Sequence, residues 1–168
     1  MKRQLIILAT AFALLAGCGG GAEDDAPVQA AAPATTQANQ TEAAAPAEPP
    51  EACALITKQD AEKLAGTKLD PPVEAAESCQ YTGPVTGPTA QVEIYVGDGA
   101  KKFLDIDREL KHEFTELSGI GDEAHLEDGT VFFAKGGVWV AIRLVRLVDP
   151  KETRKPLEAA ARTAAGRM

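Results

Sequence analysis

The segment LSGIGDEAHLEDG, residues 117–129, contains Gly119, Gly121 and an alanine in the spacing G-x-G-x-x-A. This spacing is typical of the turn that binds the pyrophosphate of a dinucleotide, but only where a strand precedes it and a helix follows. Here the residue pattern predicts a helix before the motif and a strand after it, and Asp122 and Glu123 would repel phosphates. We therefore expect no nucleotide cofactor, and we interpret the glycines as a sharp turn that leads into a β-meander.

Other residues that could bind a metal or act as nucleophiles do not complete a known arrangement. His112 begins a near match to H-E-x-x-H, but Glu116 stands where a zinc site would need the second histidine. Asp98, Asp105 and Asp107 lack the spacing of a calcium-binding loop, so we interpret them as part of a charged, solvated helix face. Neither serine of the chain lies in G-x-S-x-G. We expect no metal and no cofactor.

The meander after this segment offers a candidate binding surface. Two-residue turns at positions 128–129 and 136–137 would pair Phe132 with both His125 and Ala141. One face would then carry an apolar set suited to a core, namely Leu126, Val131, Phe133, Val140, Ile142 and Leu144. The opposite face would carry His125, Phe132, Trp139 and Arg143 around the small residues Ala134 and Ala141. Aromatic and arginine side chains of this kind could form a recognition patch. Alternatively, a helix covers this face too, and Trp139 packs beneath it.

Cys53 and Cys79 form an even pair in the part of the chain that should fold. We expect a disulfide between them if the protein reaches an oxidising compartment. A metal or redox role is the alternative, but the two are not in a C-x-x-C arrangement and no histidine lies near either in sequence.

The N-terminal residues have the layout of a signal peptide, with Lys2 and Arg3 before an apolar stretch over residues 5–15 and small residues next to it. That stretch is shorter than the about 20 residues that a membrane-spanning helix needs. The letters LAGC at positions 15–18 closely resemble the bacterial lipoprotein signal.

The lipoprotein resemblance implies that Cys18 becomes the first residue of the mature chain and carries several acyl chains, which hold it on a membrane. Gly19 stands where an aspartate would favour retention in the inner membrane, so the resemblance favours the outer membrane, facing the periplasm, in a cell with two membranes. Residues 19–50 are rich in Ala, Pro, Gln, Thr and acidic residues, which predicts a disordered tether. The expected organisation is a signal peptide over 1–17, the lipidated cysteine and tether over 18–50, and a folded domain over 51–168.

The net charge of the chain is -8 at pH 7. An acidic surface repels phosphate backbones, so we expect no nucleic-acid partner.

The pattern of the folded part predicts an α+β domain. It indicates a short helix ending near Gly66, strands over 79–82 and 90–96, a helix over 100–114 and three strands up to residue 148. The last strand is the most apolar, so it should lie centrally in the sheet. A final helix should hold Pro156 in its first turn and end near Gly166. The expected order is α, β, β, α, β, β, β, α, with an antiparallel sheet packed against helices.

In the helix over residues 100–114, the side chains that share one stripe and should face the sheet are Phe103, Ile106, Leu110 and Phe114.

Four segments together resemble a family of small bacterial secreted lipoproteins of unknown function. They are CALIT at 53–57, CQY at 79–81, GIGDEA at 119–124, and residues 131–137 before a long apolar strand. Such domains are similar to the α+β fold of PsbP-like proteins and of extracellular sensor domains of some bacterial kinases. The resemblance implies a binding or accessory module without catalysis, and an envelope protein or a small molecule as its partner. The alternative is an envelope enzyme of unfamiliar type that uses Asp122, Glu123 and His125.

Overall fold

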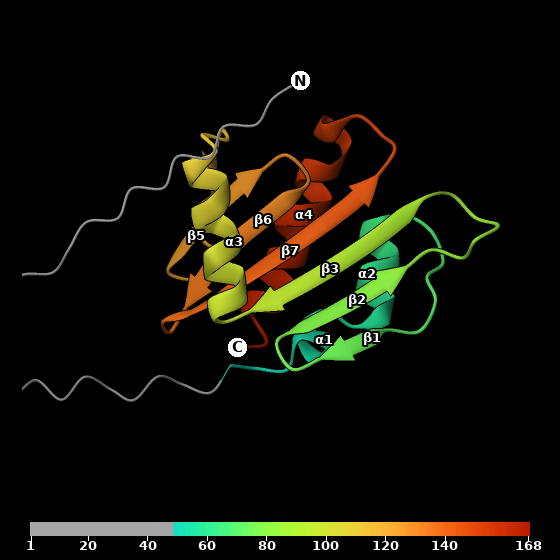
Figure 1. Ribbon diagram of the computed structural model, residues 1–168, viewed down its shortest axis with the longest axis horizontal. Helices are drawn as coiled ribbons and strands as arrows, with labels where there is room; N and C mark the ends of the chain where they lie inside the picture. The colour runs from blue at the N-terminus through green and yellow to red at the C-terminus, as the bar shows by residue number, and fades with distance from the viewer. Residues whose placement is uncertain (1–48) are drawn as a thin grey trace, which may run out of the picture. The chain divides into compact units, whose positions relative to one another are not determined.

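A computed structural model describes residues 49–168, so the expected signal peptide, Cys18 and most of the tether lie outside the described residues. The chain forms the following elements: α1 Ala52–Leu55, α2 Lys58–Ala65, β1 Val73–Ala75, β2 Ser78–Thr82, β3 Ala90–Val96, α3 Asp98–Glu109, β4 Thr115–Glu116, β5 Glu123–Glu127, β6 Thr130–Lys135, β7 Val138–Arg146 and α4 Pro150–Ala165. The strands make one antiparallel sheet in the order β1-β2-β3-β7-β6-β5-β4. The α+β fold is confirmed, and β7 lies at the centre of the sheet as predicted (Figure 1).

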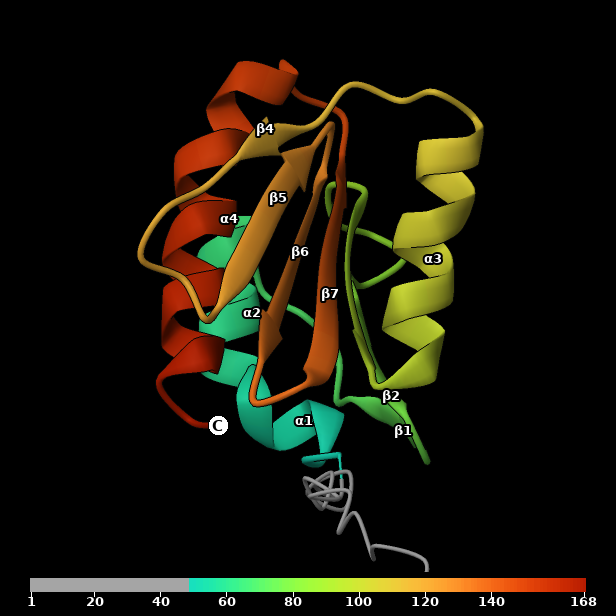
Figure 2. The same ribbon diagram turned by 90° about the vertical axis from the view of Figure 1, so that its left-hand side faces the viewer.

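The sheet separates two unequal helical layers. Helices α1, α2 and α4 pack on one face, and α3 is the one helix of residues 49–168 that packs on the other (Figure 2). The burial of β3 reflects this difference between the two layers. Its residues alternate between buried positions that face the three helices and half-buried positions on the other face. The main core therefore lies beneath α1, α2 and α4, and a smaller apolar cluster lies beneath α3.

The register of the meander agrees with the tight turns of the sequence. Phe132 pairs with His125 on β5 and with Ala141 on β7. The turn glycines Gly129, Gly136 and Gly137 all have positive φ, a conformation that glycine adopts without a steric penalty. The apolar set expected on one face of the meander is buried in the main core, as predicted.

Helix α3 ends earlier than its sequence pattern predicts. It stops at Glu109 because Lys111 adopts a left-handed conformation with φ 62°. The amide of Lys111 donates to the carbonyl of Arg108 (3.0 Å), and the amide of His112 donates to the carbonyl of Asp107 (3.0 Å). These two bonds make a Schellman cap, which here forms around a lysine instead of the usual glycine.

The stripe that α3 turns toward the sheet differs in part from the expected one. Phe103 and Phe114 pack against the apolar cluster beneath α3, as predicted, although Phe114 lies beyond the end of the helix. Its buried residues are Ala100, Leu104 and Asp107. Ile106 and Leu110, which the apolar pattern placed on the sheet side, are 54% and 63% exposed. The small side chain of Ala100 allows the helix to approach the sheet closely, and packing therefore selects this stripe over Ile106 and Leu110.

Helix α4 begins six residues before the expected Pro156. Asp149 caps its first turn by accepting a hydrogen bond from the amide of Lys151 (2.9 Å), and Pro150 takes the first position. Proline is favourable there because it has no amide hydrogen that would need a partner. Pro156 lies inside the helix, so its expected place in the first turn is wrong.

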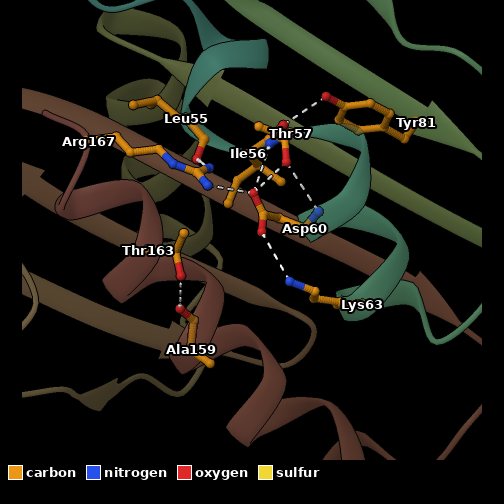
Figure 3. A network of polar contacts seen from close by, with 9 residues as sticks. All are labelled: Leu55, Ile56, Thr57, Asp60, Lys63, Tyr81, Ala159, Thr163 and Arg167. Atoms are coloured by element: carbon orange, nitrogen blue, oxygen red, sulfur yellow. Dashed lines mark hydrogen bonds and ion pairs between the residues drawn. The ribbon is translucent and has the colours of Figure 1, made fainter.

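The two ends of the domain are joined by polar contacts (Figure 3). Thr57 and Asp60 form a capping box at the start of α2. Arg167, just after α4, donates to the carbonyl of Leu55 (2.5 Å) and to the carboxylate of Asp60 (2.7 Å). The hydroxyl of Tyr81 donates to the carbonyl of Ile56 (2.7 Å). A disulfide between Cys53 and Cys79 joins α1 to β2, as predicted.

Candidate functional site

The candidate surface on the meander lies on the sheet face that α3 covers in part. Phe132 is fully buried against Ala100, Leu104 and Ala141. Its ring meets the ring of Phe103 edge to face, with centroids 5.2 Å apart. The sequence left open whether this face is a recognition patch or is covered by a helix. At Phe132 the structure shows that helix α3 covers it.

His125 and Trp139 lie together at the margin of this cover. Their rings stack with centroids 6.5 Å apart and an interplanar angle of 10°. His125 is buried, whereas Trp139 is half-buried. Trp139 borders a surface hollow of about 280 Å³, into which Lys101 also reaches, with its ammonium 5.9 Å from the centre of the indole ring. Trp139 is thus a part of the predicted patch that a ligand could still contact.

Arg143 lies apart from this pair. Its guanidinium forms an ion pair with Glu93 on β3 (3.4 Å) and sits 6.0 Å from the ring centre of Phe103. Of the four predicted residues, His125 and Trp139 therefore meet each other, Phe132 is buried beneath α3, and Arg143 pairs with β3 instead.

The acidic residues of the alternative enzyme site also separate. Glu123 accepts from Nε2 of His125 (2.6 Å), and Arg108 lies beside both of them. This hydrogen bond from His125 lowers the pKa of the Glu123 carboxyl, against a smaller opposing effect of burial. Asp122 instead accepts from the amide of Gly136 (2.8 Å), at the turn between β6 and β7. Only Glu123 and His125 meet.

The glycines of the G-x-G-x-x-A segment lie in the loop before β5, and a strand follows them as predicted. Gly121 has φ 56°, and a Cβ atom at this position would lie 2.2 Å from the carbonyl oxygen of Ala134. The amide of the next residue, Asp122, donates to that same oxygen (2.7 Å). The glycine is needed because the loop closes directly onto the end of β6.

A second polar cluster lies under the C-terminal end of α3, and the sequence analysis did not find it. It consists of Asp107 from α3, His112 from the Schellman cap and Glu127 from β5. Nδ1 of His112 lies 2.5 Å from the nearest oxygen of Glu127 and 3.7 Å from the nearest oxygen of Asp107. Burial, together with the charge of Asp107, raises the pKa of the Glu127 carboxyl, and the hydrogen bond with His112 opposes this rise.

Asp107 does not lie on a solvated helix face, which corrects the sequence interpretation. The residue is only 5% exposed. Leu104 follows Ala100 by four residues and Asp107 follows Leu104 by three, so the buried stripe itself was visible in the sequence. The larger apolar residues on the neighbouring stripe concealed this signal.

No helix between residues 49 and 168 is long and apolar enough to cross a membrane. Comparisons with protein-family models, with curated proteins and with solved structures found no match for this chain.

Proposed function

We propose that this protein is a membrane-anchored lipoprotein of the bacterial envelope, and that its folded domain is a binding or accessory module rather than an enzyme. The LAGC motif ending at Cys18 and the Ala- and Pro-rich segment after it support the anchor and the tether. The resemblance of four segments to small secreted lipoproteins supports the same assignment. Gly19 after the cysteine favours the outer membrane, with the domain facing the periplasm.

The disulfide supports export of the domain. Cys53 and Cys79 are joined, and such bonds persist mainly in oxidising compartments. The bacterial periplasm is one of these compartments.

The uneven cover of the sheet carries the proposal of a binding module. Among the described residues, α3 is the helix on its face of the sheet, and it contacts β3 and β7, so the β1-β2 side of that face has no helix over it (Figure 1). We call this less covered surface the open half-face; its residues are Gln80, Gln91, Glu93, Arg143 and Val145. Tyr95 lies at its border, where its ring meets the ring of Phe103 on α3 edge to face, with centroids 6.0 Å apart.

The open half-face has the composition of a protein-binding surface. It combines an aromatic ring at its border, Tyr95, with an arginine, Arg143, and these residue types contribute strongly to interfaces. Glu93 pairs with Arg143 (3.4 Å) and accepts a hydrogen bond from Gln91 (2.5 Å), so these polar side chains are held in place before a partner arrives. A flat surface of this kind suits an envelope protein as the partner, and the acidic net charge of -8 disfavours nucleic acid.

Replacing the proposed lipid acceptor tests the anchor. We expect Cys18→Ser to move the protein from the membrane fraction to the soluble fraction, because the hydroxyl cannot take the place of the thiol in the lipid linkage. Labelling with radioactive palmitate should be lost as well. The matched control is Gly19→Ala, which keeps the cysteine and should remain in membranes. Full membrane retention of the serine variant would contradict the lipoprotein assignment.

Photo-crosslinking in intact cells tests the open half-face. A photoreactive residue at Gln91 should give a discrete crosslinked protein, whereas one at Lys155, exposed on α4 on the other side of the sheet, should not. Arg143→Glu should weaken the crosslink at Gln91. Equal products from the two positions would show that the open half-face is not the binding surface.

A further inference from the structure

The cluster of Asp107, His112 and Glu127 has the composition and spacing of a metal site. Each residue offers one ligand atom, and these atoms all lie within 4.8 Å of one another. Zinc bonds to nitrogen and oxygen are about 2.0 to 2.2 Å long, which places neighbouring ligands of a tetrahedral ion about 3.4 Å apart. The separations of 2.5 Å and 3.7 Å from Nδ1 of His112 fall on either side of that value. Small side-chain rotations would therefore bring all three atoms into the first coordination shell.

One oxygen of the cluster needs a partner that the described residues do not provide. Oδ2 of Asp107 is buried, and no protein group within residues 49–168 donates a hydrogen bond to it. A buried carboxylate oxygen without a donor or a cation is strongly disfavoured. This oxygen is the observation that points to a bound cation.

The nearest arginine is committed elsewhere. Arg108 follows Asp107 in α3, but its guanidinium contacts Glu123 (3.4 Å) and His125 (2.9 Å). In the described part of the chain, the only cationic side chain that makes an ion pair with Asp107 or Glu127 is His112. One buried and one half-buried carboxyl group thus share one imidazole, so a bound cation would balance their negative charge.

The backbone around the cluster also favours a cation. Asp107 lies in the last turn of α3, where the helix dipole is negative and a carboxylate is disfavoured. The Schellman cap holds His112 against this end of the helix. Glu127 reaches the same point from the end of β5, so the three ligands come from two rigid elements and one cap.

We propose that Asp107, His112 and Glu127 bind a divalent transition-metal ion, best matched by Zn²⁺, which joins the end of α3 to β5. One imidazole with two carboxylates suits zinc, whereas Mg²⁺ and Ca²⁺ prefer ligand sets made of oxygen alone. Three protein ligands leave a coordination position for water or for a group from a partner. This inference goes beyond the proposed binding function and does not depend on it.

A zinc titration of the full-length protein tests the site. The protein is purified in detergent without a polyhistidine tag, treated with EDTA, dialysed and titrated by calorimetry. We expect one Zn²⁺ to bind per chain and to raise the unfolding temperature, because metal that binds the folded state stabilises it. Mg²⁺ and Ca²⁺ should bind far more weakly.

Variants assign the ligands. His112→Ala, Asp107→Asn and Glu127→Gln should each weaken Zn²⁺ binding by at least roughly tenfold and abolish the thermal shift. The matched control is His125→Gln, which removes the other of the two histidines of the chain and should keep the affinity. The side chain of His112 is 41% exposed, so its replacement should leave the fold intact even if the change at buried Asp107 does not. Absence of zinc binding in the wild type, or unchanged binding in the His112→Ala variant, would overturn the proposal.

Discussion

Phe132 shows how a residue suited to recognition can instead be structural. Its ring is fully buried between β6 and α3 and also contacts the ring of Phe114, with centroids 6.1 Å apart. Trp139 lies on the same face of the neighbouring strand β7, and part of its side chain is exposed. A partner of this face can therefore reach Trp139 but not Phe132.

We predict that Phe132→Ala lowers the free energy of unfolding by about 3 to 5 kcal/mol, because it empties a buried site between sheet and helix. Trp139→Phe, on the margin of the same cluster, should cost less than about 1.5 kcal/mol. Urea denaturation followed by circular dichroism measures both. Similar small losses for the two variants would mean that α3 does not seal this face.

Asp60 joins the start of the domain to its end. Burial opposes ionisation of this carboxyl, but hydrogen bonds from Thr57 and Arg167 and the charge of Arg167 outweigh it and lower its pKa. A carboxyl whose pKa is lower in the folded state stabilises the fold above its unfolded pKa. This stabilisation is lost as the pH falls through the folded value, which here lies below the ordinary 3.8.

We predict that Asp60→Asn destabilises the domain by about 1 to 2 kcal/mol at neutral pH, since the charged partner of Arg167 is lost. The difference from wild type should shrink as the pH falls below 3.8. Denaturation curves at several pH values measure it, with Glu152→Gln, an exposed acid on α4, as the control. A difference that stays constant down to the lowest pH would refute the role of the Asp60 charge.

At the scale of elements, the loop between β4 and β5 depends on close backbone contact. Gly121 lets this loop press against the end of β6, where a side chain would collide with the carbonyl of Ala134. Gly136, in the turn between β6 and β7, also has positive φ, but a Cβ atom there would meet nothing within 4 Å. Both glycines have a left-handed backbone conformation, but only at Gly121 would a Cβ atom collide with a neighbouring atom.

This pair gives a third prediction. Gly136→Ala should cost about 1 kcal/mol, the strain of a left-handed alanine. Gly121→Ala should cost at least about 2 kcal/mol, because the loop must move and the amide of Asp122 loses its bond to Ala134. Thermal unfolding of the two variants measures the difference. Equal losses would mean that the loop is free to shift and that Gly121 serves backbone conformation alone.

At the scale of the whole molecule, the first helices are held to the domain by covalent and polar links. The disulfide closes a separation of 26 residues between α1 and β2. Arg167 makes a second link, from the C-terminal end to α1 and α2. The segment that holds α1 and α2 is therefore fixed to the rest of the domain at two places.

We predict that replacing Cys53 and Cys79 together by alanine lowers the free energy of unfolding by about 3.5 kcal/mol, the loop-closure value for this separation. Thiol counting on denatured, unreduced protein provides the direct check. In a Cys18→Ser background, neither remaining cysteine should react. Two reactive thiols would contradict the disulfide and reopen a metal or redox role for the pair.

The sequence by itself determined the α+β fold, the central place of β7, the meander register and the cysteine pair. The fold and the register depend on signals that lie within a few residues, such as the alternation in β3, the turn at Gly136-Gly137 or the capping box that begins at Thr57. The cysteine pair follows from the even number of cysteines in the part of the chain that folds. The early end of α3 was not visible, because Lys111 takes the left-handed position where glycine is usual.

Only the tertiary structure decided which residues meet. Two stripes of α3 have helical spacing, and packing against β7 selected the one with Ala100 over the one with Ile106. That choice buried Asp107 and brought it to Glu127, twenty positions further along the chain. It also covered Phe132 and left Trp139 at the margin. Periodicity shows that a face is apolar, but the element that packs on it depends on contacts between segments distant in sequence, which no local pattern contains.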